Sequence, residues 1–188
     1  MASSDLRTFF AIELGGAARR IAAEVAKRLA AEPGGEEVRW TRPEAYHVTL
    51  RFVGRTPRDH VVDLARAVQR RVAGTAPFAL SLGALHAFPS PRRPRVVVLD
   101  VEPAAPIAAL ARTVEQGVAD AGFPPEERAF HPHLTLGRVM ERSRTTPRLH
   151  ASLGPTEPAP FDVASVVFFQ SVLAPGGSRY TPLARIEF

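Results

Sequence analysis

Hydrophobic residues recur along the chain in two patterns, one typical of helices and one of strands. Val61, Leu64, Val68 and Val72 fall on one face of a helix, and Gly74 follows its end. Elsewhere, short apolar or alternating runs are bounded by glycine and proline, which is typical of strands. These patterns predict helices within residues 17–32, 57–74 and 106–122, and strands at 6–14, 38–40, 47–54, 77–88, 95–102, 133–139, 161–173 and 179–188.

The order of these elements predicts an α+β fold, because helices and strands are interspersed without a regular βαβ repeat. Residues 141–160, rich in Arg, Thr and Pro, predict a long surface connection, and Pro175-Gly176-Gly177 predicts a turn. No linker is long or polar enough to divide the chain, so residues 1–188 are expected to form a single domain.

A near-repeat divides this domain into halves. HVTL at residues 47–50 and HLTL at 133–136 each open a predicted strand, and their histidines lie 86 residues apart, close to half of the 188-residue chain. This spacing favours two pseudo-symmetric lobes that face each other rather than a tandem array.

The composition excludes several kinds of protein. The chain has no cysteine, so disulfides, iron–sulfur clusters and thiolate zinc sites are excluded. No apolar run is long enough to span a membrane, and the N-terminus lacks the features of a signal peptide, so a cytoplasmic location is expected. Arginine supplies nearly all of the basic residues, and the net charge is +5. This composition suits a phosphate or nucleic-acid partner, but the codon usage of a GC-rich genome explains it equally well.

The repeated motif places polar and apolar residues on opposite faces of a strand. His47 and Thr49 share one face because side chains alternate, and His133 and Thr135 repeat this arrangement. Two such strands can bring two imidazoles and two hydroxyls around one point. One neutral and one protonated imidazole can act as general base and general acid, while hydroxyls bind phosphate oxygens. The pattern therefore favours phosphodiester chemistry that requires no metal.

Three neighbouring residues allow more than one interpretation. Arg51 shares the His47 face by alternation, and it is either a surface or cleft-edge charge or a substrate contact. His131 and His133 form an H-x-H pair, but no further ligand is evident nearby, so no metal site is expected. Phe130 is either a residue that stacks on a nucleobase or a core residue at the start of a strand.

Five segments in the same order resemble the 2H phosphoesterase superfamily, and more closely its RNA 2′,3′-cyclic phosphodiesterases, also called 2′-5′ RNA ligases. The segments are RTFFAIEL, HVTLRFVG, RPRVVVLDV, FHPHLTLGR and GGSRYTPL. The resemblance covers almost the whole chain. It implies a bilobal fold, in which two pseudo-symmetric lobes of antiparallel sheet with outer helices surround a central cleft.

The resemblance also implies an activity, namely hydrolysis of RNA 2′,3′-cyclic phosphate termini to 2′-phosphate ends, with weak reversible 2′-5′ ligation as an accompanying reaction. His47 would be the general acid and His133 the general base, with Thr49 and Thr135 on the phosphate oxygens. Arg138 would contact the phosphate, although simple alternation places it on the opposite face unless the strand bulges at Gly137.

The expected partner is RNA with a 2′,3′-cyclic phosphate end, such as a tRNA fragment or an oligonucleotide. We expect a monomer without cofactor or membrane association. Two alternatives stay open at this point. One is a 2H phosphoesterase that acts on a small cyclic nucleotide, and the other is a catalytically silent RNA-binding module.

Overall fold

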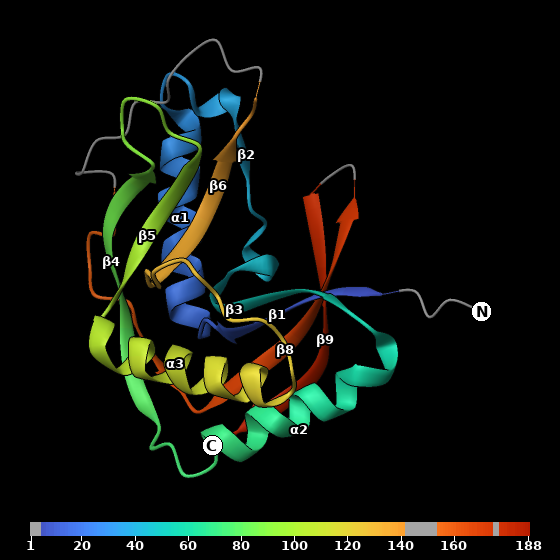
Figure 1. The fold of residues 1–188 in the computed structure, drawn as a ribbon. Coiled ribbons are helices and arrows are strands. Elements are labelled where there is room, and N and C mark those ends of the chain that lie inside the picture. Colours follow the sequence, from blue (N-terminus) through green and yellow to red (C-terminus); the bar gives the residue numbers. More distant parts are fainter. Residues whose placement is uncertain (1–4, 142–153, 175–176) are drawn as a thin grey trace.

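The computed structural model describes residues 5–141, 154–174 and 177–188, which form two antiparallel sheets and three α-helices (Figure 1). Sheet A has the strand order β3-β1-β8-β9 and contains β1 (Leu6–Glu13), β3 (His47–Thr56), β8 (Ser165–Ala174) and β9 (Gly177–Glu187). Sheet B has the order β2-β6-β5-β4-β7 and contains β2 (Val38–Trp40), β4 (Phe78–Phe88), β5 (Val96–Glu102), β6 (His133–Val139) and β7 (Pro160–Val163). The helices are α1 (Gly16–Ala31), α2 (Val61–Val72) and α3 (Ala104–Asp120), and short 3₁₀ turns precede β2, β3 and α2 at Gly35–Glu37, Pro43–Ala45 and Arg58–His60.

The two sheets are built by the same unit, a strand, a helix and a second strand that returns antiparallel to the first. In sheet A this unit is β1-α1-β3, and in sheet B it is β5-α3-β6. Each helix packs on the sheet of the other unit, since α1 contacts β6 and β7 while α3 contacts β3 (Figure 1). Because each helix packs on the sheet of the other unit, the two motif strands, β3 and β6, lie in neighbouring lobes. The α+β class and the pseudo-symmetric pair of lobes predicted from the sequence are confirmed.

Each sheet buries one face and leaves the other toward the space between the lobes. One continuous core runs through both sheets and includes Phe10, Ile12 and Val48 from sheet A and Leu134 and Leu136 from sheet B. Alternation along β1 then turns Phe9 and Ala11 to the opposite face, where a small separate cluster forms. The apolar residues of the two motifs therefore anchor their strands in the core, as the sequence predicted.

The chain passes from sheet B to sheet A within a segment that the sequence pattern predicted as one strand. Residues 161–173 do not form one strand, because β7 ends at Val163 in sheet B and β8 begins at Ser165 in sheet A. Both halves are apolar, and the pattern carries no sign that the chain changes sheets at Ala164. The predicted connection at 141–160 and the turn at 175–177 lie largely outside the described residues. No helix in the described ranges is long and apolar enough to cross a membrane.

The close packing of α2 on α3 depends on Gly117. A Cβ built at this position would lie 2.6 Å from the Cα of Val68 on the backbone of α2, so alanine would force the helices apart. We expect Gly117→Ala to lower the free energy of unfolding by about 1–2 kcal/mol, since overpacking exceeds the gain in helix propensity. Gly16→Ala is a matched control, because the nearest atom there belongs to a flexible Arg20 side chain at 3.8 Å. Urea unfolding of both variants checks the prediction, and equal effects would contradict it.

Candidate active site

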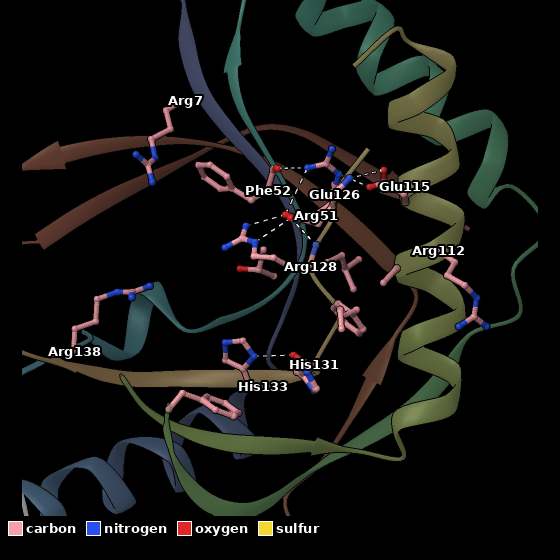
Figure 2. Close-up of a pocket in the computed structure, with 16 residues that line it drawn as sticks. Arg7, Arg51, Phe52, Arg112, Glu115, Glu126, Arg128, His131, His133 and Arg138 are labelled. Carbon is pink, nitrogen blue, oxygen red and sulfur yellow. Dashed lines mark hydrogen bonds and ion pairs between the residues drawn. The ribbon is translucent and has the colours of Figure 1, made fainter. Parts of the chain in front are cut away.

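A cleft of about 720 Å³ lies between the two lobes (Figure 2). Strands β1 and β3 from sheet A, β4 and β6 from sheet B, helix α3 and the loop before β6 all contribute side chains to it. Its lining is rich in arginine and aromatic residues, namely Arg7, Arg51, Arg112, Arg128, Arg138, Phe52, Phe88, Phe130, His131 and His133, together with Thr49, Leu50, Ala111, Glu115, Glu126 and Ala129. We call this space the main cleft.

The two motif histidines are held in the same way. Nδ1 of His47 hydrogen bonds to the carbonyl oxygen of Ala45 at 2.8 Å, and Nδ1 of His133 bonds to that of His131 at 2.7 Å. A carbonyl oxygen can only accept, so Nδ1 carries the hydrogen in both rings. Nε2 is therefore the nitrogen left free on each ring, and it can accept a proton when neutral or donate one when charged.

Strand register gives the histidines similar surroundings. His47 lies opposite Glu13 in the pairing of β3 with β1, and His133 lies opposite Asp100 in the pairing of β6 with β5. Directly paired residues of antiparallel strands share a face, so each imidazole has a carboxylate beside it. Glu13 also pairs with Arg185 at 2.5 Å, and Asp100 pairs with Nε2 of His86 at 2.9 Å. The sequence did not reveal these acids, because only the register brings them to the histidines.

Aromatic rings enclose His47 more than His133. The ring centroids of Phe9 and Tyr180 each lie 4.9 Å from that of His47, with Tyr180 edge-on. His133 has one such neighbour, Phe88, at 5.9 Å. Burial among these rings lowers the pKa of His47 below its ordinary value of 6.5, while the hydrogen bond that its Nδ1 donates to the Ala45 carbonyl oxygen raises it. The charges of His133 and Arg138 lower it further, which places both groups within electrostatic reach of His47.

This electrostatic coupling can be measured. We expect Arg138→Gln to raise the pKa of His47, because removing a nearby positive charge makes protonation easier. An NMR titration of the His47 ring checks the direction. Arg7→Gln serves as a control, since Arg7 lines the same cleft but is not among the groups that shift His47. An unchanged or lower pKa in Arg138→Gln would contradict the placement.

The disputed position of Arg138 is resolved by a bulge in β6. Thr135 pairs with Val98 and Gly137 with Val97, so Leu136 is an extra residue that reverses the alternation. Arg138 consequently lies on the His133 face and lines the main cleft (Figure 2). A Cβ at Gly137 would lie 2.5 Å from Cγ1 of Val38, so only glycine lets β2 approach the strand at the bulge.

The same bulge occurs after the first motif and corrects the interpretation of Arg51. Thr49 pairs with Ala11 and Arg51 with Phe10, which makes Leu50 the extra residue. Arg51 therefore turns away from the His47 face and is 7% exposed, so it is a buried residue in the wall of the main cleft and not a surface charge. Phe52 occupies the position on the cleft face that simple alternation assigned to Arg51. The guanidinium carbon of Arg7 lies 4.7 Å from the centroid of the Phe52 ring.

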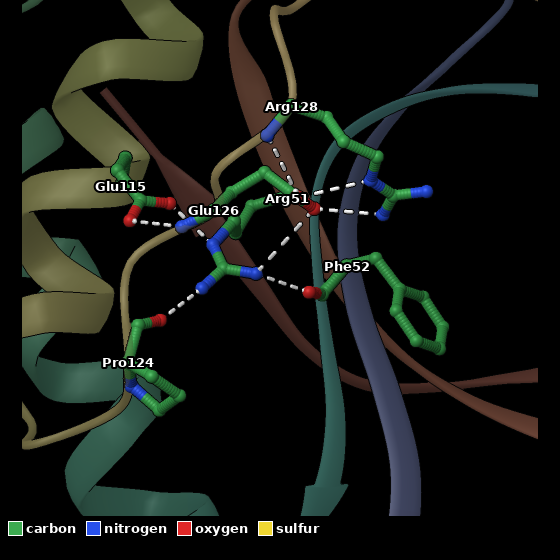
Figure 3. A network of polar contacts seen from close by, with 6 residues as sticks. All are labelled: Arg51, Phe52, Glu115, Pro124, Glu126 and Arg128. Atoms are coloured by element: carbon green, nitrogen blue, oxygen red, sulfur yellow. Dashed lines mark hydrogen bonds and ion pairs between the residues drawn. The ribbon is translucent and has the colours of Figure 1, made fainter.

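Arg51 instead binds the loop that leads into the second motif (Figure 3). Its guanidinium forms ion pairs with Glu115 of α3 and Glu126 of the loop, and it donates hydrogen bonds to the carbonyl oxygens of Phe52 and Pro124. Glu115 also accepts from the backbone N–H of Glu126 at 3.1 Å. The loop that carries Phe130 and His131 is thus fixed to both β3 and α3.

The residues predicted from the sequence occupy different parts of the site. Thr49, Phe130, His133 and Arg138 line the main cleft, and Phe130 also packs against the core. His47 adjoins the cleft on the face of Thr49. Thr135 is half-buried on the face of His133 and does not line the cleft itself. Among the described residues, no group of three or more His, Asp or Glu is arranged to hold a metal ion.

Comparison with known proteins agrees with this architecture. Residues 14–173 match the family described as the 2′-5′ RNA ligase superfamily. RNA 2′,3′-cyclic phosphodiesterases of Aeropyrum pernix and Methanothermobacter thermautotrophicus are 32% and 31% identical, over 81% and 95% of this chain and 88% and 96% of theirs. The structure of E. coli LigT complexed with 3′-AMP superposes with a TM-score of 0.76 and 27% identity, covering 98% of both chains. The chain therefore belongs to the 2′-5′ RNA ligase superfamily, as a member of its RNA 2′,3′-cyclic phosphodiesterase family.

Proposed function

We propose that this enzyme hydrolyses the 2′,3′-cyclic phosphate at the end of an RNA to a 2′-phosphate, by two-histidine acid–base catalysis. The observation that carries the proposal is the matched pair of imidazoles, one from each lobe. Both have Nδ1 bound to a carbonyl oxygen two residues earlier in the chain, which leaves Nε2 free for proton transfer. Because the reacting groups come from both lobes, residues 1–188 act as one domain in this proposal.

In the proposed reaction, Nε2 of His133 takes a proton from a water molecule as the water attacks phosphorus. The bond from phosphorus to the 3′ oxygen breaks, and Nε2 of His47 gives that oxygen a proton. The products are a 2′-phosphomonoester and a free 3′-hydroxyl. This assignment of acid and base follows the family pattern. Weak 2′-5′ ligation would be the same displacement with a 5′-hydroxyl in place of water, and cleavage of the 2′-5′ linkage would be its reverse, with the two roles exchanged.

The lowered pKa of His47 bears on its role as the acid. In the free protein, burial and the charge of Arg138 oppose its protonation. A phosphodiester between the lobes would add a negative charge beside the ring and favour the protonated form. His47 would then gain its proton together with the substrate. We therefore expect the loss of activity at high pH, which follows deprotonation of His47, to occur at a lower pH in kcat/KM than in kcat. The reason is that kcat/KM reports the free enzyme and kcat the enzyme with bound substrate, and pH profiles of both constants check this.

The remaining motif residues would bind the phosphate. Thr49 and Thr135 each share a strand face with a histidine, so their hydroxyls can donate to the non-bridging oxygens. Arg138 reaches the same face through the bulge and offers a fork of N–H donors suited to phosphate. Phe130 lines the cleft, where it would stack on the terminal base. The structures of E. coli LigT with 3′-AMP and with phosphate support a site of this chemistry.

A panel of substrates tests the proposal. The protein is incubated in EDTA with an oligoribonucleotide that ends in a 2′,3′-cyclic phosphate and, separately, with a 2′,3′-cyclic mononucleotide. We expect turnover of the RNA with a 2′-phosphate as the product end. A 3′-phosphate product, or turnover of the mononucleotide alone, would contradict the proposal. RNA binding without any turnover would instead indicate a silent binding module.

A further inference from the structure

A second groove, of about 220 Å³, adjoins the main cleft at Arg138. It lies between strand β2 with the turn that follows it and the ends of strands β8 and β9. Arg39, Trp40 and Arg42 contribute from one side, and Arg179 and Tyr180 of β9 contribute from the other. Arg138 is the residue that lines both spaces, so the second groove opens directly onto the motif residues.

The second groove concentrates positive charge without compensation. Arg39, Arg42, Arg138 and Arg179 are exposed, and the groove lining contains no aspartate or glutamate. Within the described residues none of these four arginines forms an ion pair or a side-chain hydrogen bond. The segments outside the described ranges contain no acidic residue either, so they can supply no carboxylate. Four like charges repel one another unless an anion lies among them.

This charge arrangement differs from that of the main cleft. There, Arg51 and Arg128 are paired with Glu115 and Glu126, so part of the charge serves the structure. In the second groove the whole charge remains available to a ligand. Guanidinium groups at intervals along a groove fit the repeated phosphates of a nucleic-acid backbone better than they fit one small anion.

Two aromatic residues lie among these arginines. Nε1 of Trp40 donates a hydrogen bond to the carbonyl oxygen of Gly35 at 3.0 Å, which fixes the orientation of the indole. Tyr180 packs edge-on against His47, with ring centroids 4.9 Å apart, so this groove reaches the ring of a motif histidine. A basic groove that contains aromatic rings is typical of proteins that bind single-stranded RNA, because the bases can stack while the arginines neutralise the phosphates.

We propose that the second groove binds the backbone of single-stranded RNA, so that the polynucleotide continues from the reacting phosphate past Arg138 and along Arg39, Arg42 and Arg179. The inference rests on the proposed function only for the place where this RNA ends. The protein would then bind a longer RNA more tightly than a mononucleotide, because a mononucleotide would occupy only the main cleft.

The test uses a triple variant of the full chain, Arg39→Gln, Arg42→Gln and Arg179→Gln. Arg138 is left intact because it also lines the main cleft. A matched control, Arg20→Gln, Arg66→Gln and Arg70→Gln, removes the same charge from exposed positions of α1 and α2 that line neither space. Binding of a fluorescent ten-nucleotide RNA with a 3′-hydroxyl end, which is no substrate, is followed by anisotropy over a series of salt concentrations.

We expect the groove variant to bind this RNA at least about tenfold more weakly at low salt. The slope of log affinity against log salt should fall by about two, since each lost phosphate contact on a single strand accounts for about 0.7. The control variant should stay close to the wild type. Equal losses in both variants would mean that only net charge matters, and no loss in the groove variant would mean that RNA does not bind there. Either result would overturn the proposal.

Turnover of a 2′,3′-cyclic mononucleotide separates this inference from the proposed function. We expect the groove variant to retain the wild-type kcat and KM for the mononucleotide while KM for a ten-nucleotide cyclic-phosphate RNA rises. An equal loss on both substrates would overturn the inference, because the arginines would then belong to the reaction centre. If the wild type turned over neither substrate but the groove variant still lost RNA binding, the proposed function would be wrong. RNA binding by the second groove would still be supported.

Discussion

Replacing either motif histidine by alanine is expected to lower kcat on an RNA 2′,3′-cyclic phosphate by about 10²–10⁴, the usual worth of one positioned acid or base. Each ring offers one free nitrogen, and the other ring cannot take over its task because it lies on the opposite lobe. His47→Ala should remove proton donation to the leaving oxygen, and His133→Ala should remove activation of water. Single-turnover rates with saturating enzyme measure the chemical step without interference from weakened binding.

His60→Ala provides the matched control for these two variants. His60 lies in the 3₁₀ turn before α2, edge-on to Phe123, and lines neither the main cleft nor the second groove. Its removal should change the rate by less than about twofold, because no proton transfer depends on it. A loss in His60→Ala as large as in the motif variants would show that imidazole removal acts through stability. Retention of full activity in either motif variant would refute the paired-histidine mechanism.

Replacing Arg51 by methionine is expected to lower the free energy of unfolding by about 2–3 kcal/mol. Breaking a buried ion pair by removing one partner costs about 3–5 kcal/mol, but the carboxylates of Glu115 and Glu126 are 29% and 27% exposed, so water compensates part of this cost. Methionine retains the apolar stem, which confines the effect to the guanidinium. The loop before β6 loses its hydrogen bond at Pro124, so KM for RNA should rise as well.

The same substitution at Arg55 is a control on the same strand. The guanidinium of Arg55 pairs with Asp5 at 3.0 Å but is 88% exposed, and such surface pairs contribute little. Urea unfolding should show a small change for Arg55→Met and a large one for Arg51→Met. Adding Glu115→Gln to Arg51→Met should restore part of the stability, because the carboxylate left without its partner is removed. Equal effects of the two methionine variants would contradict the structural role of Arg51.

The pKa of Glu126 helps to set the pH range over which the ion pairs around Arg51 persist. Hydrogen bonds from the Arg128 side chain lower the pKa of Glu126 to about 2, with a smaller contribution from Arg51. A carboxylate with a lowered pKa in the folded state stabilises the fold above its unfolded pKa, near 4.5, and this stability is lost as the pH falls toward 2. The loop that leads into His133 therefore keeps its ion pairs throughout the neutral range.

The strand faces of the two motifs could be predicted from the sequence because alternation is a local property. His47 with Thr49, and His133 with Thr135, follow directly from the period of two, and Leu134 is buried as that pattern requires. The bulges were harder to predict, since each depends on a neighbouring strand. At Gly137 the decisive contact is with Val38, which is almost one hundred residues away in the chain.

Arg51 and the second groove show where sequence patterns are uninformative. A charged residue is rarely buried, so it was reasonable to expect that the strand alternates without interruption and leaves Arg51 exposed. Its partners lie on α3 and in the loop before β6, and only the tertiary fold brings them to it. The arginines of the second groove come from β2, the connection that follows it, β6 and β9, with long separations in the chain. A chain with arginine throughout gives no sign of which residues will gather.

The most direct test of the central claim, that the two lobes supply one acid and one base to the same phosphate, uses a substrate that needs no acid. In an RNA 2′,3′-cyclic phosphate with sulfur in place of the 3′ bridging oxygen, the leaving thiolate departs without a proton. We expect His47→Ala to cleave this substrate within about tenfold of the wild type, while His133→Ala stays slower by about 10²–10⁴. Equal rates for the two variants, or recovery of His133→Ala alone, would contradict the account.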